Sequence, residues 1–152
     1  MTTETPPITP YEEMGGEPAL LAVLDELYTL LFDDVMVGFL FAGHDRERIV
    51  REQAVFTRRF LGDDTAVYTG KSIPDAHAAL PILPPHFDRR HLLLREVLER
   101  HGVPERVREH WLRVDLGLRD AVLKVGRARI EELRYKPDHE HDTGTDAGRP
   151  AR

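Results

Sequence analysis

Cysteine is absent from the 152 residues of this sequence. Its absence excludes disulfides, thiolate zinc sites, a cysteine nucleophile and haem attached through thioether bonds. Any metal must therefore be held by histidine, carboxylate or tyrosine side chains.

Long apolar runs and an excess of positive charge are also missing. Nowhere do about eighteen apolar residues occur together, as a membrane-spanning helix requires. Residues 1–7 lack the basic start and apolar run of a signal peptide. The net charge of −6 argues against a nucleic-acid or anionic membrane partner, because either calls for a basic face. We therefore expect a soluble cytoplasmic protein with neither partner.

Several familiar catalytic motifs are absent as well. The sequence has no glycine-rich phosphate loop, metalloprotease helix motif, calcium loop or nucleophile elbow. Its length suits one domain, which buries roughly two thirds of its unfolded surface and has room for a prosthetic group.

The most informative stretch present surrounds His77. Thr69-Gly70 forms a turn, Ser72 is a candidate helix cap, Pro74 lies near the first helical position and Pro81 ends the helix. So short a helix is not stable alone and must pack against other elements. A neutral imidazole among small and apolar neighbours can ligate a metal or haem iron. The alternative is an ordinary histidine bonded to the backbone.

Apolar residues recur at helical spacing in longer segments, which we expect to be helices. These segments are residues 18–32, 45–61, 85–100 and 104–125. A short helical turn at residues 11–14 and the Gly15-Gly16 break precede them. Residues 35–41 form an apolar run, and we expect it to be buried on most of its sides.

Two polar side chains fall on apolar helical stripes. Tyr28 belongs to the stripe of residues 18–32, where a core tyrosine is the alternative to a functional one. Gln53 lies within a stripe formed by Ile49, Phe56 and Phe60. An unsatisfied buried amide costs about 1–3 kcal/mol, so Gln53 either bonds another element or faces a ligand.

A set of short motifs resembles the truncated haemoglobin family, also called 2-on-2 globins, and most of all its first group. The motifs are Glu52-Gln53-Ala54-Val55-Phe56, Leu61-Gly62, Tyr68-Thr69-Gly70, Ala76-His77 and His86-Phe87-Asp88. The resemblance covers about residues 10–125. It implies an all-α fold, a 2-on-2 helical sandwich that encloses one b-type haem, iron protoporphyrin IX.

The resemblance also implies roles for individual residues. His77 would be the proximal iron ligand, and Tyr28 and Gln53 would act on the bound ligand from the distal side. Leu27 is the alternative to Tyr28, because the spacing to Asp33-Asp34 is one residue shorter than in the family. Phe41 would pack against the haem plane, with Phe39 as the alternative. The other haem-binding positions would be Ile49, Phe56, Phe87 and Arg90.

Arg90 departs most clearly from the family pattern, which has an apolar residue or tryptophan at this position. Its side chain could reach outward to a haem propionate or to Asp88, or the helix could be rotated so that His91 fills the site. Alternatively, its charge enters the distal pocket and polarises a bound peroxide. His86 and His91 are alternative axial ligands. Asp63 replaces a second glycine of the family's loop, which affects only that loop.

The function implied by the resemblance is reversible binding of diatomic ligands, chiefly O2 but also NO and CO. This function includes oxygen transport and the oxidation of nitric oxide to nitrate with a separate reductase. The alternatives are a peroxidase-like haem enzyme and a haem-based sensor or interaction module. We expect a monomer or weak dimer, with a disordered arm at residues 1–9, the globin domain at 10–125, and a helical extension with a disordered acidic tail at 126–152.

Overall fold

The computed structural model describes residues 4–123, and this part of the chain contains helices and no strand. Residues 4–8 precede the first helix and are exposed. The extension and tail expected at 126–152 lie outside the described residues. Among the helices of residues 4–123, none combines the length and the apolar character needed to cross a membrane.

The expected helices are present, with boundaries shifted by one or two residues in most cases. They are α1 (Pro10–Glu13), α2 (Gly16–Asp33), the 3-10 helix η1 (Gly38–Phe41), α3 (Arg46–Phe60), α4 (Ile73–His77), α5 (Pro84–Arg100) and α6 (Glu105–Gly117). The helix expected over residues 104–125 is interrupted at Leu118, and residues 119–123 are helical again. Gly117 precedes the interruption, and glycine weakens a helix by about 1 kcal/mol relative to alanine.

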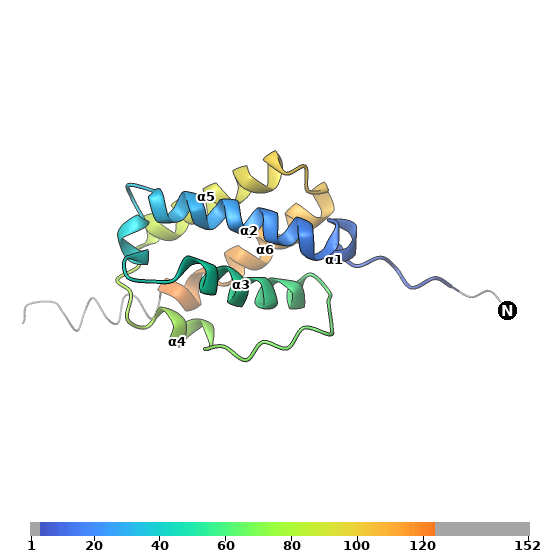
Figure 1. Cartoon of the computed structure of the whole chain (residues 1–152), viewed down its shortest axis with the longest axis horizontal. Helices are drawn as coiled ribbons and strands as arrows, with labels where there is room; N and C mark the ends of the chain where they lie inside the picture. Colours follow the sequence, from blue (N-terminus) through green and yellow to red (C-terminus); the bar gives the residue numbers. More distant parts are fainter. Residues whose placement is uncertain (1–3, 124–152) are drawn as a thin grey trace, which may run out of the picture.

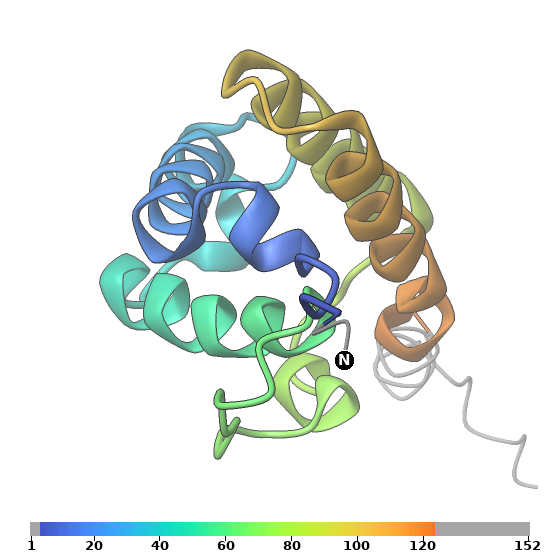
Figure 2. The same ribbon diagram turned by 90° about the vertical axis from the view of Figure 1, so that its right-hand side faces the viewer.

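The helices form two layers of two. Helix α2 packs against α3 and also against α5, which in turn packs against α6. Figure 2 shows α2 and α3 on one side of the molecule and α5 and α6 on the other. The short helix α4 lies at the edge, below α3 in both views (Figures 1 and 2). The core between the layers consists mainly of leucine and valine side chains, with Tyr28, Phe87 and Trp111.

The Gly15-Gly16 break has a conformational reason. Both glycines have positive φ, +112° and +71°, which side chains other than glycine rarely adopt. The break separates α1 from α2, and the Tyr11 amide donates to the carbonyl of Leu61 at 2.9 Å. The turn thus lets α1 fold back onto the end of α3.

The apolar run at residues 35–41 is less buried than expected. Val37 and Leu40 are in the core, whereas Val35, Met36 and Phe39 are exposed. The expectation of burial on most sides is wrong, because this segment is a turn followed by the single turn of η1. Such a connection presents only part of its side chains to the core.

Candidate functional site

Helix α4 fixes the orientation of His77. Its N-terminus is capped by Ser72, whose hydroxyl accepts the Asp75 amide at 3.3 Å. At its other end, His77 Nδ1 lies 2.6 Å from the carbonyl oxygen of Ile73. Nδ1 must therefore carry the proton and donate, which leaves the lone pair on Nε2. This tautomer is the one that a metal ligand requires.

His77 is held neutral as well as oriented. Burial lowers its pKa by disfavouring the imidazolium; the bond to Ile73 opposes this effect, and the Arg90 cation adds to it. A metal binds the neutral ring, so the environment suits ligation. The bond to Ile73 is equally compatible with the ordinary backbone-bonded histidine considered above. It occupies Nδ1 in both cases, and the two interpretations differ only in what Nε2 binds.

The Tyr68-Thr69-Gly70 motif positions the segment that leads to α4. The Tyr68 hydroxyl donates to the carbonyl of Lys71 at 2.7 Å. A Cβ on Gly70 would lie 2.5 Å from that hydroxyl and 2.6 Å from the ring, so a larger residue there would displace the Tyr68 side chain. The ring of Phe56 meets Tyr68 edge-on at 5.7 Å, which joins α3 to this segment.

Aromatic rings surround Tyr28 on α2. Tyr28 is buried, and its ring meets that of Phe41 edge-on with centroids 6.1 Å apart. Phe41 also stacks on Phe32 at 4.9 Å. Phe39 is 57% exposed, so the structure places Phe41 rather than Phe39 beside Tyr28. Leu27, the alternative to Tyr28, is completely buried in the core.

The stripe that contains Gln53 is only partly buried. Gln53 is half-buried, as are Ile49 and Phe56, whereas the buried side chains of α3 are Val50, Ala54 and Thr57. Helix α3 therefore packs against the core with a neighbouring face. Within the partly buried stripe, Ile49 packs against the core and the Phe56 ring meets Tyr68 of the segment that leads to α4.

Arg90 turns toward α6. Its Nη1 lies 2.5 Å from Oδ1 of Asp115, and Oδ2 of the same carboxylate lies 2.8 Å from Nδ1 of His91. The alternative that pairs Arg90 with Asp88 is wrong, because Asp88 instead pairs with Arg119 at 3.2 Å. One carboxylate thus holds two consecutive side chains of α5.

Burial and ion pairing together shift the pKa values of Arg90 and Asp115. Burial opposes the charge of Arg90, but the Asp115 carboxylate and the Tyr28 hydroxyl stabilise the cation, so its pKa is raised. Desolvation likewise opposes the Asp115 carboxylate, and Arg90 and His91 nevertheless keep its pKa below the usual range. The Arg90 cation in turn contributes to lowering the pKa of His77.

The other candidate side chains occupy separate places. Phe87 is buried under the Arg119 guanidinium, 5.9 Å from its ring centroid. His86 Nδ1 accepts the Leu83 amide at 3.0 Å, and His91 bonds Asp115. Within residues 4–123, no group of three or more histidine and carboxylate side chains is placed to hold a metal ion. A metal at His77 would therefore need most of its ligands from a bound prosthetic group.

Two residues of this region were not identified from the sequence. Asp115 lies four residues after the buried Trp111 and therefore on the core-facing side of α6. An acidic residue at a core-facing position was the sequence signal that could have identified it. Thr57 lies four residues after Gln53 and is completely buried, and among the described residues its hydroxyl has no hydrogen-bond partner. Buried polar atoms of this kind occur where a protein faces a ligand or ordered water.

Comparison with known proteins identifies the family. The sequence model of the bacterial-like globin family matches residues 9–123. The group 1 truncated hemoglobin of Tetrahymena pyriformis is 31% identical over 101 residues, which are 66% of this chain and 83% of that protein. Group 1 truncated hemoglobin GlbN of a Nostoc species is 30% identical over 95 residues, 62% of this chain and 80% of the relative.

Solved structures show the same fold. The truncated hemoglobin of T. pyriformis in its Fe(III) form has a TM-score of 0.69 and 28% identity, covering 76% of this chain and 97% of that one. The 2/2 hemoglobin of Synechococcus has a TM-score of 0.72 at 23% identity, covering 77% and 99%. The chain therefore belongs to the bacterial-like globin family and has the 2-on-2 fold of a group 1 truncated globin.

Proposed function

We propose that this protein is a haem-binding globin in which His77 ligates the iron of haem b through Nε2. Membership of the family supports haem binding in general. The observation that carries the assignment to His77 is the 2.6 Å contact between its Nδ1 and the Ile73 carbonyl. That bond fixes the tautomer and leaves Nε2 as the free donor atom.

Haem, when bound, supplies the iron site at which O2, NO or CO binds and the redox chemistry that nitric oxide oxidation requires. The side chains of Tyr28 and Gln53 would act on the ligand from the side opposite His77. The Tyr28 hydroxyl and the Gln53 amide each donate a hydrogen bond, and such bonds to a charged acceptor contribute roughly 1.5–3 kcal/mol. Both would therefore slow the release of O2.

Apolar side chains complete the site. Phe41 packs edge-on against Tyr28, Phe87 is buried on α5, and Ile49 and Phe56 lie on the partly buried stripe of α3. These side chains would exclude water and so strengthen the hydrogen bonds that Tyr28 and Gln53 donate. A protein that holds O2 in this way can oxidise nitric oxide to nitrate, with electrons supplied by a separate reductase.

A peroxidase-like activity is the second candidate. The feature that favours it is the stabilisation of the Arg90 cation by Asp115 and the Tyr28 hydroxyl, which raises the pKa of Arg90, because a cation beside that hydroxyl would polarise a bound peroxide. Turnover of hydrogen peroxide by the wild type and by Arg90→Leu tests this candidate. Equal turnover by the two proteins would remove Arg90 from such a mechanism.

The test of the proposed function is haem uptake by the wild type, His77→Ala and His86→Ala. Absorption spectra are recorded for the ferric, ferrous and carbon monoxide forms. The wild type and the control His86→Ala should show a strong Soret band and a histidine-type carbonyl spectrum, which His77→Ala should lose. Unchanged spectra for His77→Ala, or no haem uptake by the wild type, would contradict the proposal.

A further inference from the structure

Two rows of side chains lie next to each other on the outer surface of α5 and α6, which pack together on one side of the molecule (Figure 2). Both rows follow the spacing of one helical face. The row on α5 consists of Asp88, Leu92, Arg95 and Glu99. The row on α6 and the turn after it consists of Arg108, Leu112, Leu116 and Arg119. We call these two rows the α5–α6 face.

Ion pairs align the two rows at both ends. Asp88 Oδ1 lies 3.2 Å from Nε of Arg119, and Glu99 Oε1 lies 3.8 Å from Nη1 of Arg108. The residue order is opposite in the two rows, so the helices are antiparallel. Each row therefore has charged ends of one sign, acidic on α5 and basic on α6.

The middle of the α5–α6 face is apolar and open to water. The register set by the two ion pairs brings Leu92 and Leu116 to the same level of their helices. Leu92 is 38% exposed and Leu116 52%, and Leu112 is half-buried against the core. An apolar centre between charged ends has the composition of a small protein interface, which combines an apolar core with a polar rim.

We propose that the α5–α6 face binds the same face of a second copy of this chain, as a weak two-fold dimer. The charges select this partner. When the two-fold axis runs parallel to the helices, α5 of one copy lies opposite α6 of the other, and acidic ends meet basic ends. An axis across the helices would place α5 opposite α5, with carboxylates facing carboxylates.

The size of the apolar centre sets the strength of the dimer. Three leucines from each copy form a small contact, so we expect a dissociation constant on the order of 0.1 mM. Arg95 has the opposite sign to the ends of its row. Its long side chain can hold the guanidinium in water at the edge of the interface. The proposal concerns assembly and does not depend on the haem site.

The first experiment follows sedimentation of the full-length protein from about 10 µM to 1 mM, a range that spans the expected dissociation constant. Leu116→Glu places a charge in the apolar centre and should weaken the dimer at least about tenfold. Val67→Glu makes the same gain of charge at a 73% exposed apolar position on the loop between α3 and α4, and should dimerise as the wild type does. A wild type that is monomeric at the highest concentration, or equal dimerisation by Leu116→Glu, would overturn the proposal.

The second experiment tests the two-fold arrangement by exchanging charges. The variant Asp88→Arg/Glu99→Arg has basic ends on both rows, and Arg108→Glu/Arg119→Glu has acidic ends on both rows. Each variant alone should remain monomeric, because like charges meet across the interface. An equimolar mixture should dimerise at least as strongly as the wild type. Circular dichroism checks that both variants are folded. A mixture of folded variants that stays monomeric, or either variant dimerising alone, would overturn the arrangement.

Discussion

Two groups of ion pairs contact the helices of this globin, and they differ in burial. Near Tyr28, the cluster of Arg90, His91 and Asp115 is buried, and the Asp115 side chain is only 8% exposed. On the surface of α2, Asp25 pairs with Arg46 of α3 at 3.3 Å, and the Asp25 side chain is 62% exposed. The same fold thus holds charge in two very different environments.

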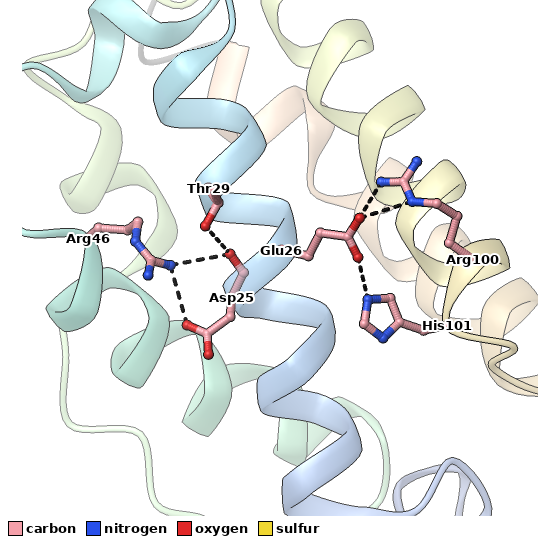
Figure 3. A network of polar contacts seen from close by, with 6 residues as sticks. All are labelled: Asp25, Glu26, Thr29, Arg46, Arg100 and His101. Atoms are coloured by element: carbon pink, nitrogen blue, oxygen red, sulfur yellow. Dashed lines mark hydrogen bonds and ion pairs between the residues drawn. The ribbon is translucent and has the colours of Figure 1, made fainter.

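Figure 3 shows the surface group. On one side of α2, Arg46 reaches both the carboxylate and the backbone carbonyl of Asp25. On the other side, Glu26 accepts from Arg100 at 2.6 Å and from His101, at the end of α5. Hydrogen bonds from His101 and Arg100 lower the pKa of Glu26. The surface group therefore connects α2 to α3 on one side and to the end of α5 on the other.

The two groups differ in what an ion pair costs and contributes at each level of burial. Exposed ion pairs contribute between zero and about 1 kcal/mol each, and they cost little because water still solvates them. A buried pair carries a desolvation cost that its attraction often only offsets, so apolar residues would pack there at least as well. Charges kept at such a position therefore indicate a role other than stability.

The largest expected effect comes from breaking the buried pair on one side only. Arg90→Leu leaves the Asp115 carboxylate buried with His91 as its remaining partner, and the free energy of unfolding should fall by about 3 kcal/mol. Urea unfolding followed by circular dichroism measures this change. Arg90→Leu/Asp115→Leu removes both charges and should recover most of the loss. A double variant less stable than the single one would contradict the comparison.

The smallest expected effect comes from the surface group. Arg100→Gln removes an exposed partner of Glu26 and should lower the free energy of unfolding by less than about 1 kcal/mol. The same unfolding experiment, repeated at high salt, should show an even smaller difference, because salt screens exposed charges. A loss of unfolding free energy as large as that of Arg90→Leu would show that burial does not determine how much an ion pair contributes to stability.

The fold was largely predictable because its signals are local. Apolar periodicity located α2, α3 and α5, and the cap and proline signals located α4. The interruption at Leu118 was not predicted, since the apolar stripe continues across it. The exposure of Val35 and Phe39 was also missed, because an apolar run does not show that its segment is a turn.

The candidate site was predictable in part, for the same reason. Resemblance to a family pointed to His77, Tyr28 and Gln53, and the structure buries Tyr28 in the core and orients His77 through the carbonyl of Ile73. The partner of Arg90 was not predictable. Asp88 is near in sequence, whereas Asp115 is 25 residues away and meets Arg90 only through the packing of α5 against α6.

The most direct test of the account is the infrared C–O stretching frequency of the carbon monoxide form. A positive field at the ligand lowers this frequency, so the wild type should absorb at a lower frequency than Arg90→Leu. The surface variant Arg100→Gln should match the wild type. Equal frequencies in Arg90→Leu and the wild type would contradict the proposal that the Arg90 cation acts on the bound ligand.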